Sequence, residues 1–443
     1  MKKFIVLFTV IVSALVLMVA TAAAQPTTYD SGFQVQNLGD GAATVNITFY
    51  NQDGSVEAQV DDSIALNGSK TYFPLPGGVS SGFDGSVVIS SDQPVAAITN
   101  VLGDGFDYGA SYGGFDGGAG SVNLPLIMRN NGGFSTWFNV QNTGASATSV
   151  TVSYANSSCT ETASIQPGAA ATFDQSTNTC LGSTYVGAAT VAAAAGGEVV
   201  ATVIETGKDT LFAYNGFTVG SSSVVMPLVQ ANNSGYHTGV QVQNTGNTST
   251  NVTLTYTPAA GAPGTTCTET KSIGAGASET FFLYALSLNG AAGTNNCTKG
   301  QAFVGSAAVT ANSASMDLVA IVNQTNFKNY GSAYNGFDPN TATDSLVMPL
   351  IMDRNSGFFT GFNIMNVGSS ATVTCTFSNS SRTYSAALGT NAAGNDVQNG
   401  KIADKYVGSA SCSAPGGAII AVVNELGASS SSDLLFTYEA FNN

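Results

Sequence analysis

The sequence predicts an all-β protein built from four tandem β-sandwich domains behind a signal peptide. Three observations support this prediction: a short phrase that recurs four times, an alternation of apolar and polar residues with a period of two, and a basic N-terminus followed by an apolar run. The first gives the number of repeats, the second indicates strands, and the third indicates export.

The N-terminus has the organisation of a secretory signal. Lys2 and Lys3 precede an apolar run from Phe4 to Ala20, and small residues end at Ala24. We expect residues 1–24 to be removed and the mature chain to be secreted, extracellular or associated with the cell surface. No later stretch reaches the about 20 uninterrupted apolar residues that span a bilayer, so we expect no membrane insertion of the mature chain.

Three markers recur in a fixed order and divide the mature chain into four repeats. The opening phrase occurs as Phe33-Gln-Val-Gln-Asn37, Phe138-Asn-Val-Gln-Asn142, Val240-Gln-Val-Gln-Asn244 and Phe362-Asn-Ile-Met-Asn366. The closing phrase occurs as Tyr112-Gly-Gly-Phe115, Tyr214-Asn-Gly-Phe217, Tyr334-Asn-Gly-Phe337 and Tyr438-Glu-Ala-Phe441. A Val-Gly-Ala or Val-Gly-Ser strand lies between them in the last three repeats. The predicted domains span 25–118, 119–220, 221–340 and 341–443.

Strand periodicity is clear within each repeat. Phe134, Thr136, Phe138 and Val140 alternate with polar or exposed positions, and Gly- and Pro-containing turns interrupt the chain at short intervals. About seven short strands in roughly 100 residues is typical of an immunoglobulin-like sandwich. The predicted fold is therefore all-β, with four tandem immunoglobulin-like β-sandwich domains.

The repeated phrase also resembles a known group of proteins. Phe138-Asn-Val-Gln-Asn-Thr-Gly144, followed by a strand that ends at Tyr154 or Tyr256, is similar to the bacterial extracellular tandem immunoglobulin-like repeats of the CARDB kind. This resemblance implies an adhesion, stalk or surface-layer role and brings no catalytic residues with it.

The six cysteines predict one disulfide in each of the last three domains. Six cysteines allow 15 pairings, but the domain boundaries leave two cysteines in each of domains 2, 3 and 4 and none in domain 1. The predicted pairs are Cys159–Cys180, Cys267–Cys297 and Cys375–Cys412. The sequence contains no Cys-x-x-Cys group, which is the pattern that would indicate a metal or redox site.

Charge excludes some partners and distinguishes the first domain. The chain has a formal net charge of −15 and no Lys/Arg cluster, so we expect no nucleic-acid binding. Domain 1 holds eleven acidic residues between Asp30 and Asp116 against one base, Lys70. Asp104, Asp107 and Asp116 lie on Gly-rich turns and could bind Ca²⁺, although the ordered spacing of an EF-hand loop is absent; solvated acidic loops are the competing interpretation. No other cofactor is predicted.

The sequence gives little support for catalysis. Gly109-Ala-Ser111-Tyr-Gly113 matches a hydrolase motif, but Ser111 aligns with Ala213, Ala333 and Thr437 in the other repeats. The single histidine, His237, lies in another domain, at a position held by Ser135 and Phe359, and we expect it on a strand surface. We therefore predict that the protein is not an enzyme.

Exposed aromatic side chains are the candidate ligand-binding residues. Alternation places Trp137 opposite Phe138, on the expected solvent face, and Tyr236 and Phe359 lie near the same strand in domains 3 and 4. Such residues can stack on sugars or on another protein. The alternative for Trp137 is that it packs beneath a neighbouring domain.

We expect a secreted structural or adhesive protein, such as a stalk, matrix or surface-layer component, whose partners are cell-surface or matrix components, glycans or copies of itself. An extracellular carbohydrate-binding protein is the second interpretation. The segments Ser121–Leu126, Ser223–Leu228 and Ser345–Leu350 share an apolar pattern that ends in Pro-Leu, and three such segments serve four domains. We therefore expect an incomplete sheet edge in a terminal domain.

Overall fold

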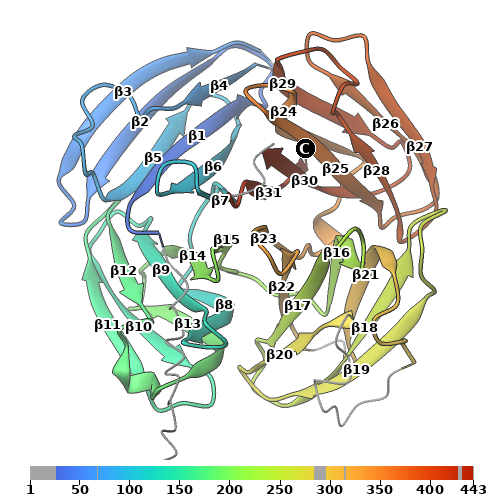
Figure 1. Cartoon of the computed structure of the whole chain (residues 1–443). Helices are drawn as coiled ribbons and strands as arrows, with labels where there is room; N and C mark the ends of the chain where they lie inside the picture. The colour runs from blue at the N-terminus through green and yellow to red at the C-terminus, as the bar shows by residue number, and fades with distance from the viewer. Residues whose placement is uncertain (1–25, 67, 284–295, 314–315, 428–431, 443) are drawn as a thin grey trace, which may run out of the picture.

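The computed structural model describes residues 26–66, 68–283, 296–313, 316–427 and 432–442. Figure 1 shows four β-rich units, numbered 1 to 4 along the chain, arranged as a closed ring. The predicted all-β fold is confirmed, because β-strands dominate and the helical elements described are two short 3-10 turns, η1 (Thr179–Leu181) and η3 (Pro339–Thr341). The four tandem units therefore lie around a common centre and do not form an extended row.

The strands fall into four successive groups. Unit 1 contains β1 (Tyr29–Asn37), β2 (Ala43–Asn51), β3 (Val56–Ile64), β4 (Ser69–Tyr72), β5 (Gly85–Ser91), β6 (Val95–Gly103) and β7 (Tyr108–Gly113). Unit 2 contains β8 (Ser121–Arg129), β9 (Ser135–Asn142), β10 (Thr148–Tyr154), β11 (Thr160–Ile165), β12 (Ala170–Asp174), β13 (Tyr185–Ala193), β14 (Val199–Gly207) and β15 (Thr210–Asn215).

The last two groups repeat the order of unit 2. Unit 3 contains β16 (Ser223–Ala231), β17 (His237–Asn244), β18 (Thr250–Pro258), β19 (Cys267–Ile273), β20 (Ser278–Phe281), β21 (Phe303–Ala311), β22 (Leu318–Thr325) and β23 (Gly331–Asn335). Unit 4 contains β24 (Ser345–Asp353), β25 (Phe358–Asn366), β26 (Ala371–Phe377), β27 (Thr383–Leu388), β28 (Ala392–Val397), β29 (Tyr406–Ser413), β30 (Ile419–Gly427), β31 (Leu435–Glu439) and β32 (Phe441–Asn442).

Each unit pairs two antiparallel sheets. In unit 2 the sheets have the orders β11-β10-β13-β8 and β12-β9-β14-β15, and units 3 and 4 repeat this arrangement, with β32 added beside β24 in unit 4. The second strand pairs with the fifth and the third with the sixth, as in an immunoglobulin sandwich. The first and seventh strands, however, have exchanged neighbours: β8 lies beside β13, and β14 lies beside β9.

Alternating side chains of each sheet pair fill a separate core. In unit 2, Phe138 and Val140 of β9 meet Val150 and Val152 of β10, and all four are fully buried. This is the period-two pattern read from the sequence, with every second side chain removed from water. The polar residues between them face outwards or towards a neighbouring unit.

The seventh strand of unit 1 and the eighth strand of each other unit lie at the ring centre. Figure 1 shows β7, β15, β23 and β31 around the middle, and each contacts the next, with β31 returning to β7. A parallel bridge between Tyr108 and Asp433 joins the first unit directly to the last. The ring is therefore closed by contacts between the two ends of the repeat array.

A tyrosine hydroxyl explains two of the repeated sequence markers. In unit 2 the hydroxyl of Tyr214 donates to the carbonyl of Leu126 at 2.6 Å and accepts from the Leu126 N–H at 3.2 Å. Tyr334 makes the same pair of bonds with Leu228, and Tyr438 makes them with Leu350. The closing tyrosine thus fixes the Pro-Leu bulge of the first strand, where the register with the neighbouring strand shifts.

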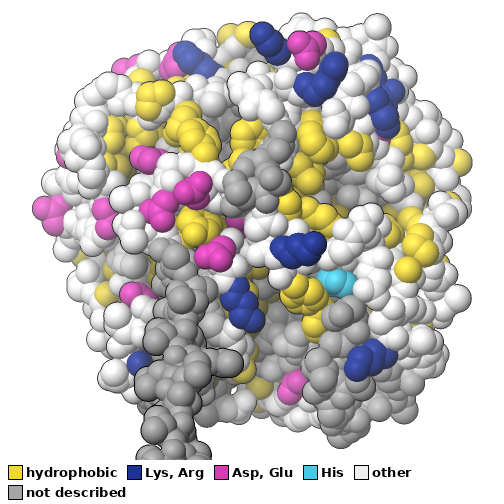
Figure 2. Space-filling model, viewed as in Figure 1, with side chains coloured by type: hydrophobic (Ala, Val, Ile, Leu, Met, Phe, Trp, Pro, Cys, Tyr) yellow, Lys and Arg dark blue, Asp and Glu magenta, His cyan; other side chains and the backbone are white. Residues whose placement is uncertain are grey.

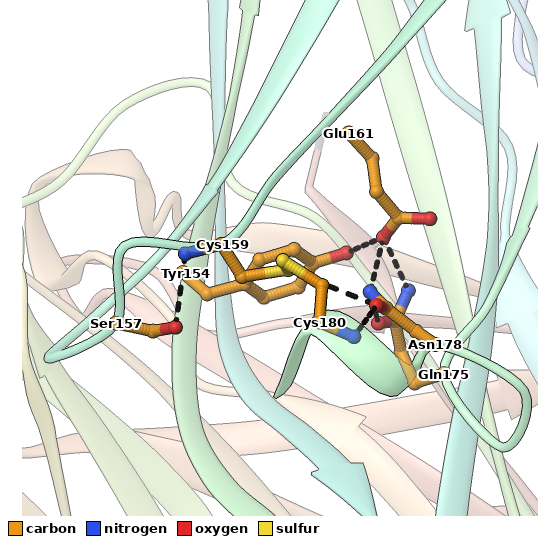
Figure 3. Close-up of a disulfide and its surroundings, with 7 residues drawn as sticks. All are labelled: Tyr154, Ser157, Cys159, Glu161, Gln175, Asn178 and Cys180. Carbon is orange, nitrogen blue, oxygen red and sulfur yellow. Dashed lines mark hydrogen bonds between the residues drawn. A yellow bond between two sulfur atoms is a disulfide. The ribbon is translucent and has the colours of Figure 1, made fainter. Parts of the chain in front are cut away.

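The three predicted disulfides are formed, one in each of units 2, 3 and 4. Cys159–Cys180, Cys267–Cys297 and Cys375–Cys412 have Cα–Cα distances of 5.4, 5.0 and 4.0 Å. Figure 3 shows that the first lies beside a polar cluster, in which Glu161 accepts hydrogen bonds from Tyr154, Gln175 and Asn178. Burial and the bond to Glu161 raise the pKa of Tyr154.

Candidate functional site at the centre of the ring

Polar side chains gather where neighbouring units meet around the central strands. These side chains occupy two consecutive positions in the seventh strand of units 2 to 4 and in the sixth strand of unit 1. The residue at the second position in one unit contacts the residue at the first position in the next unit. Three junctions are joined in this way: Asn323 Nδ2 donates to Glu205 Oε2 at 2.8 Å, Gln324 Nε2 to Asn424 Oδ1 at 3.1 Å, and Asn100 Nδ2 to Glu425 Oε2 at 3.3 Å.

The junction between units 1 and 2 uses apolar residues at the same two positions. Val101 stands where the other units have Glu205, Gln324 and Glu425, and Ile204 stands where they have asparagine. Val101 and Ile204 are buried in one small apolar cluster with Leu211 and Ala213. Both members of the pair are therefore apolar together, so neither leaves a buried polar group without a partner.

A second layer of hydrogen bonds follows the closing tyrosines. Asn215 donates through Nδ2 to the carbonyl of Gly113 at 2.8 Å, and Asn335 donates to the carbonyl of Asn215 at 2.6 Å. The side chain of Glu439 accepts a hydrogen bond from the Asn335 backbone N–H. Equivalent residues of successive units thus bond side chain to main chain around the axis.

Asp433 connects unit 4 to all the others. Its Oδ2 accepts the N–H of Leu211 at 2.8 Å, its Oδ1 accepts the N–H of Gly331 at 2.9 Å, and its own N–H donates to the carbonyl of Asp107 at 2.7 Å. Asp433 is only 1% exposed. Burial raises the pKa of its carboxyl group, whereas the hydrogen bonds from Leu211, Gly331 and Leu435 act in the opposite direction.

The other central carboxyl groups also have raised pKa values. Burial raises the pKa of Glu205 to about 8 and that of Glu425 to about 8, and the hydrogen bonds from Asn323 and Asn100 only partly oppose it. Burial raises the pKa of Glu439 to about 7. Charged forms are disfavoured here because the units exclude water from the centre.

The residues considered for catalysis lie in separate surroundings. Ser111 is buried and donates to Asn100 Oδ1 at 2.6 Å, so its hydroxyl belongs to the central hydrogen-bond network. His237, which we expected on a strand surface, is 5% exposed, because Phe327 stacks on its ring at a centroid distance of 4.9 Å. Its Nδ1 accepts the N–H of Asn232, and burial lowers its pKa.

The three candidate aromatic residues do not come together. Trp137 lies at the junction of units 1 and 2, half-buried, with Tyr29 edge-on at 5.5 Å. Tyr236 lies in unit 3 beside Tyr330, and Phe359 lies in β25 of unit 4. A cavity of about 270 Å³ is lined by Pro26, Tyr29, Ser135, Thr136, Trp137, Thr172, Asp174, Ser176 and Thr206.

The acidic residues considered for Ca²⁺ have different environments. Asp104 Oδ1 accepts hydrogen bonds from the backbone and hydroxyl groups of Thr27 and Thr28, which lower its pKa. Asp107 accepts from Ser432 at 3.4 Å, and Asp116 is exposed. Among the described residues, no group of three or more His, Cys, Asp or Glu side chains could hold a metal ion.

Sequence reasoning missed the central residues. Glu205, Glu425, Glu439 and Asp433 form no motif in the sequence, because each comes from a different position or repeat. The alignment of the repeats did contain a signal. The one junction residue that is apolar at the second position, Val101, is followed in the next repeat by the one that is apolar at the first position, Ile204. Recognising this pairing required knowing that one unit contacts the next at that place.

Comparison with protein-family models and with curated proteins finds no match for this chain. In the described part of the chain, no helix is long and apolar enough to cross a membrane. Figure 2 shows that on the face viewed, acidic side chains gather over the side of the ring that unit 1 occupies. Because no family model matches, the resemblance to CARDB-like repeats remains a prediction.

Proposed function

We propose that the protein is a secreted structural or adhesive component of the cell exterior, a rigid ring that presents its outer surface to cell-surface or matrix partners. The observation that carries this proposal is the use of the buried polar groups. Glu205, Glu425, Glu439 and Asp433 each bond to at least one other unit. Their chemistry serves to hold four units in one arrangement.

Two further features support a role that demands durability outside the cell. Three disulfides staple units 2, 3 and 4, as is common in oxidising extracellular environments. The chain also has only 12 Lys and Arg residues in 443, which leaves few sites for trypsin-like proteases.

Binding of the labelled mature protein to cells or extracted matrix of its source organism tests this function. We expect saturable binding that excess unlabelled protein displaces, and electron microscopy should show discrete ring-shaped particles or ordered assemblies of them. Absence of displaceable binding and of any assembly would argue against the proposal. Turnover of a substrate that Ser111→Ala abolishes would replace it with a catalytic function.

The cavity at Trp137 favours carbohydrate binding as a second candidate. Trp137 and Tyr29 offer aromatic surface, and Asp174, Thr172 and Ser176 add polar groups around the same space. This combination suits a sugar ring, which has apolar faces and hydroxyl edges. On a glycan array, Trp137→Ala should abolish specific binding, whereas the matched control Phe359→Ala should retain it.

A further inference from the structure

Unit 1 lacks a strand that each of the other units possesses. In units 2, 3 and 4 the first strand, β8, β16 or β24, pairs with β13, β21 or β29 and completes that sheet. The corresponding sheet of unit 1 has the order β3-β2-β5. Within the described residues, the free side of β5 therefore has no neighbouring strand, and we call this place the vacant edge.

Core-facing residues beside the vacant edge are less buried than their counterparts. Val95 and Ala97 of β6 and Val87 and Ile89 of β5 are all partly exposed. Equivalent residues in the other units are at most 3% exposed; they are Val199, Ala201, Leu318, Ala320, Ile419, Ala421, Ala189, Val191, Ala307, Val309, Ala410 and Cys412. The missing strand thus leaves apolar surface in contact with water.

The groups that would hold such a strand are present in unit 1. Tyr112 is the counterpart of Tyr214, Tyr334 and Tyr438, whose hydroxyls bond to a leucine of the first strand, but Tyr112 is only partly buried and packs against the apolar cluster at the junction with unit 2. Its hydroxyl interacts with Thr99. Phe217 and Phe337 form β-bridges to β8 and β16, whereas the equivalent Phe115 forms no β-bridge in the part of the chain that the structure describes.

The neighbouring unit does not close the gap. The rim contact between units 1 and 2, Ser86 Oγ to the carbonyl of Gly168 at 2.5 Å, matches Ser306 Oγ to Asn391 at 3.0 Å between units 3 and 4. Units 1 and 2 therefore keep this contact although the strand is absent. At the other junctions Ile98, Ile321 and Val422 pack into the core of the preceding unit, but the equivalent residue of unit 2 is Thr202.

We propose that the vacant edge of unit 1 accepts an extended segment from a separate partner protein, with the pattern Ser-aliphatic-x-Leu/Met-Pro-Leu that β8, β16 and β24 share. The inference rests on the proposed adhesive function and names the chemistry of its partner. Three occupied copies of the same site show what fits: an apolar strand whose leucine backbone meets a tyrosine hydroxyl. Strand addition of this kind gains main-chain hydrogen bonds along β5.

The place in the sequence where the missing strand of unit 1 would lie indicates that the partner segment comes from another chain. In unit 2, β8 ends shortly before β9 begins, so the segment that could complete unit 1 in this chain lies shortly before Tyr29. That part of the sequence is mostly the predicted signal peptide, whose removal we expect. Each of β8, β16 and β24 already completes its own unit.

A synthetic peptide with the sequence of Ser223–Ala231 probes the site in the mature full-length protein. By fluorescence anisotropy we expect a dissociation constant below about 100 µM, and a control peptide carrying Leu228→Asp should not bind. Hydrogen exchange of the Gly85–Ser91 amides should slow when the peptide is bound, while β13, β21 and β29 should not change. Absence of binding, or protection in units 2 to 4 alone, would overturn the proposal.

Variants of the protein locate the contact. Tyr112→Phe removes the hydroxyl that would bond to the peptide leucine and should weaken binding roughly tenfold. Tyr214→Phe is the matched control, because its site is already filled by β8, and the peptide affinity should not change. Thr99→Val restores the valine that the other units have at this position and should strengthen binding severalfold.

The oligomeric state distinguishes a separate partner from a second copy. We expect the mature protein without peptide to sediment as a monomer at the concentrations used for binding. Self-association that the peptide reverses would overturn the assignment to a separate protein, since a second copy would then occupy the vacant edge. These results do not depend on surface binding, so failure here and failure of the adhesive function can be told apart.

Discussion

The junction between units 1 and 2 and the other three junctions solve the same packing problem in opposite ways. At the centre, three junctions are hydrogen-bonded, and the fourth uses the apolar pair Val101 and Ile204. Further out, the same three are filled by apolar residues against a complete sheet, whereas the fourth has Thr202 facing unit 1 with its incomplete sheet. The junction of units 1 and 2 is therefore apolar at the centre and polar further out, whereas the other three junctions are polar at the centre and apolar further out.

This difference shows that the ring does not depend on one chemical solution. The apolar pair leaves no buried polar group at its junction, whereas Glu205 Oε1, Asn323 Oδ1 and Glu425 Oε1 of the polar pairs are buried without a hydrogen-bond partner. Unit 1, at the start of the repeat array, tolerates the absence of a first strand, which would expose the core of an internal unit. Terminal capping repeats commonly differ from internal repeats in this way. Unit 1 also lacks a disulfide, so it differs from the others in three independent respects.

Reducing the disulfides should have the largest effect on the comparison. The bridges close segments of 21, 30 and 37 residues, and each contributes about 3 kcal/mol to the free energy of unfolding in the chain-entropy model. Under reducing conditions, hydrogen exchange should rise first in units 2, 3 and 4, while unit 1 keeps its protection longest. Earlier exchange in unit 1 would show that the missing strand outweighs the missing disulfides.

Raising the pH should weaken the polar junctions selectively. Because Glu205 and Glu425 have pKa values of about 8 in the folded protein and ordinary values when unfolded, the folded state holds more protons between about pH 4.5 and 8. Stability should therefore fall as pH rises through this window, by up to about 1.4 kcal/mol per pH unit for each group. Urea unfolding at several pH values measures this slope.

Glutamine variants provide the control for the pH series. Glu205→Gln and Glu425→Gln remove two of the titrating groups and should reduce the slope between pH 5 and pH 8; burial also raises the pKa values of Glu439 and Asp433, which account for the slope that remains. Acids whose pKa is lowered, such as Asp353 and Asp62, act with the opposite sign at lower pH, because their contribution is lost as they become protonated. A slope in the double variant equal to that of the wild type would place its origin in groups other than Glu205 and Glu425.

Exchanging the two kinds of central pair tests whether they are equivalent. Asn323→Ile alone leaves the Glu205 side chain buried without its donor and should cost about 2 to 3 kcal/mol of stability. Adding Glu205→Val recreates the apolar pair of the first junction and should recover most of that loss. Chemical denaturation of the wild type, both single variants and the double variant gives the coupling energy; additive effects would contradict a matched pair.

The tyrosine hydroxyls should give the smallest effect. Tyr334→Phe removes two hydrogen bonds to Leu228 in a buried site and should cost about 1 to 2 kcal/mol. Tyr112→Phe should cost less, about 1 kcal/mol or below, because it removes the interaction of this hydroxyl with Thr99 instead of two hydrogen bonds to a first strand. Equal losses from the two substitutions would mean that Tyr112 has a partner of similar strength.

The strands and the disulfide pairs could be predicted from the sequence, but the arrangement of the units in a ring could not. Alternation along Phe134–Val140 predicted strands because side chains of a strand point alternately to two faces, and the domain positions of the cysteines predicted their pairs. Ring closure depends on contacts such as Asn100 with Glu425, which are 325 residues apart in the chain. No local periodicity encodes a contact of that kind.

The candidate site residues show the same limit. Alternation predicted Trp137 on the face of its strand opposite the core residue Phe138, but whether that face meets water or another unit depends on the ring. His237 was expected at the surface because serine and phenylalanine replace it in other repeats, yet Phe327 covers it. The central acids formed no motif because they meet only after four units have been assembled.

Asp433 has a consequence for how the protein is made. The residue that bonds to units 1, 2 and 3 belongs to unit 4, which is synthesised last, so the central polar groups cannot all find partners until almost the whole chain is available. Units 1 to 3 can form their own cores earlier, as separate domains generally do during synthesis. Assembly of the centre therefore acts as a test of completeness: a chain that ends before unit 4 presents unpaired amides and apolar surface to proteases, and a finished chain does not.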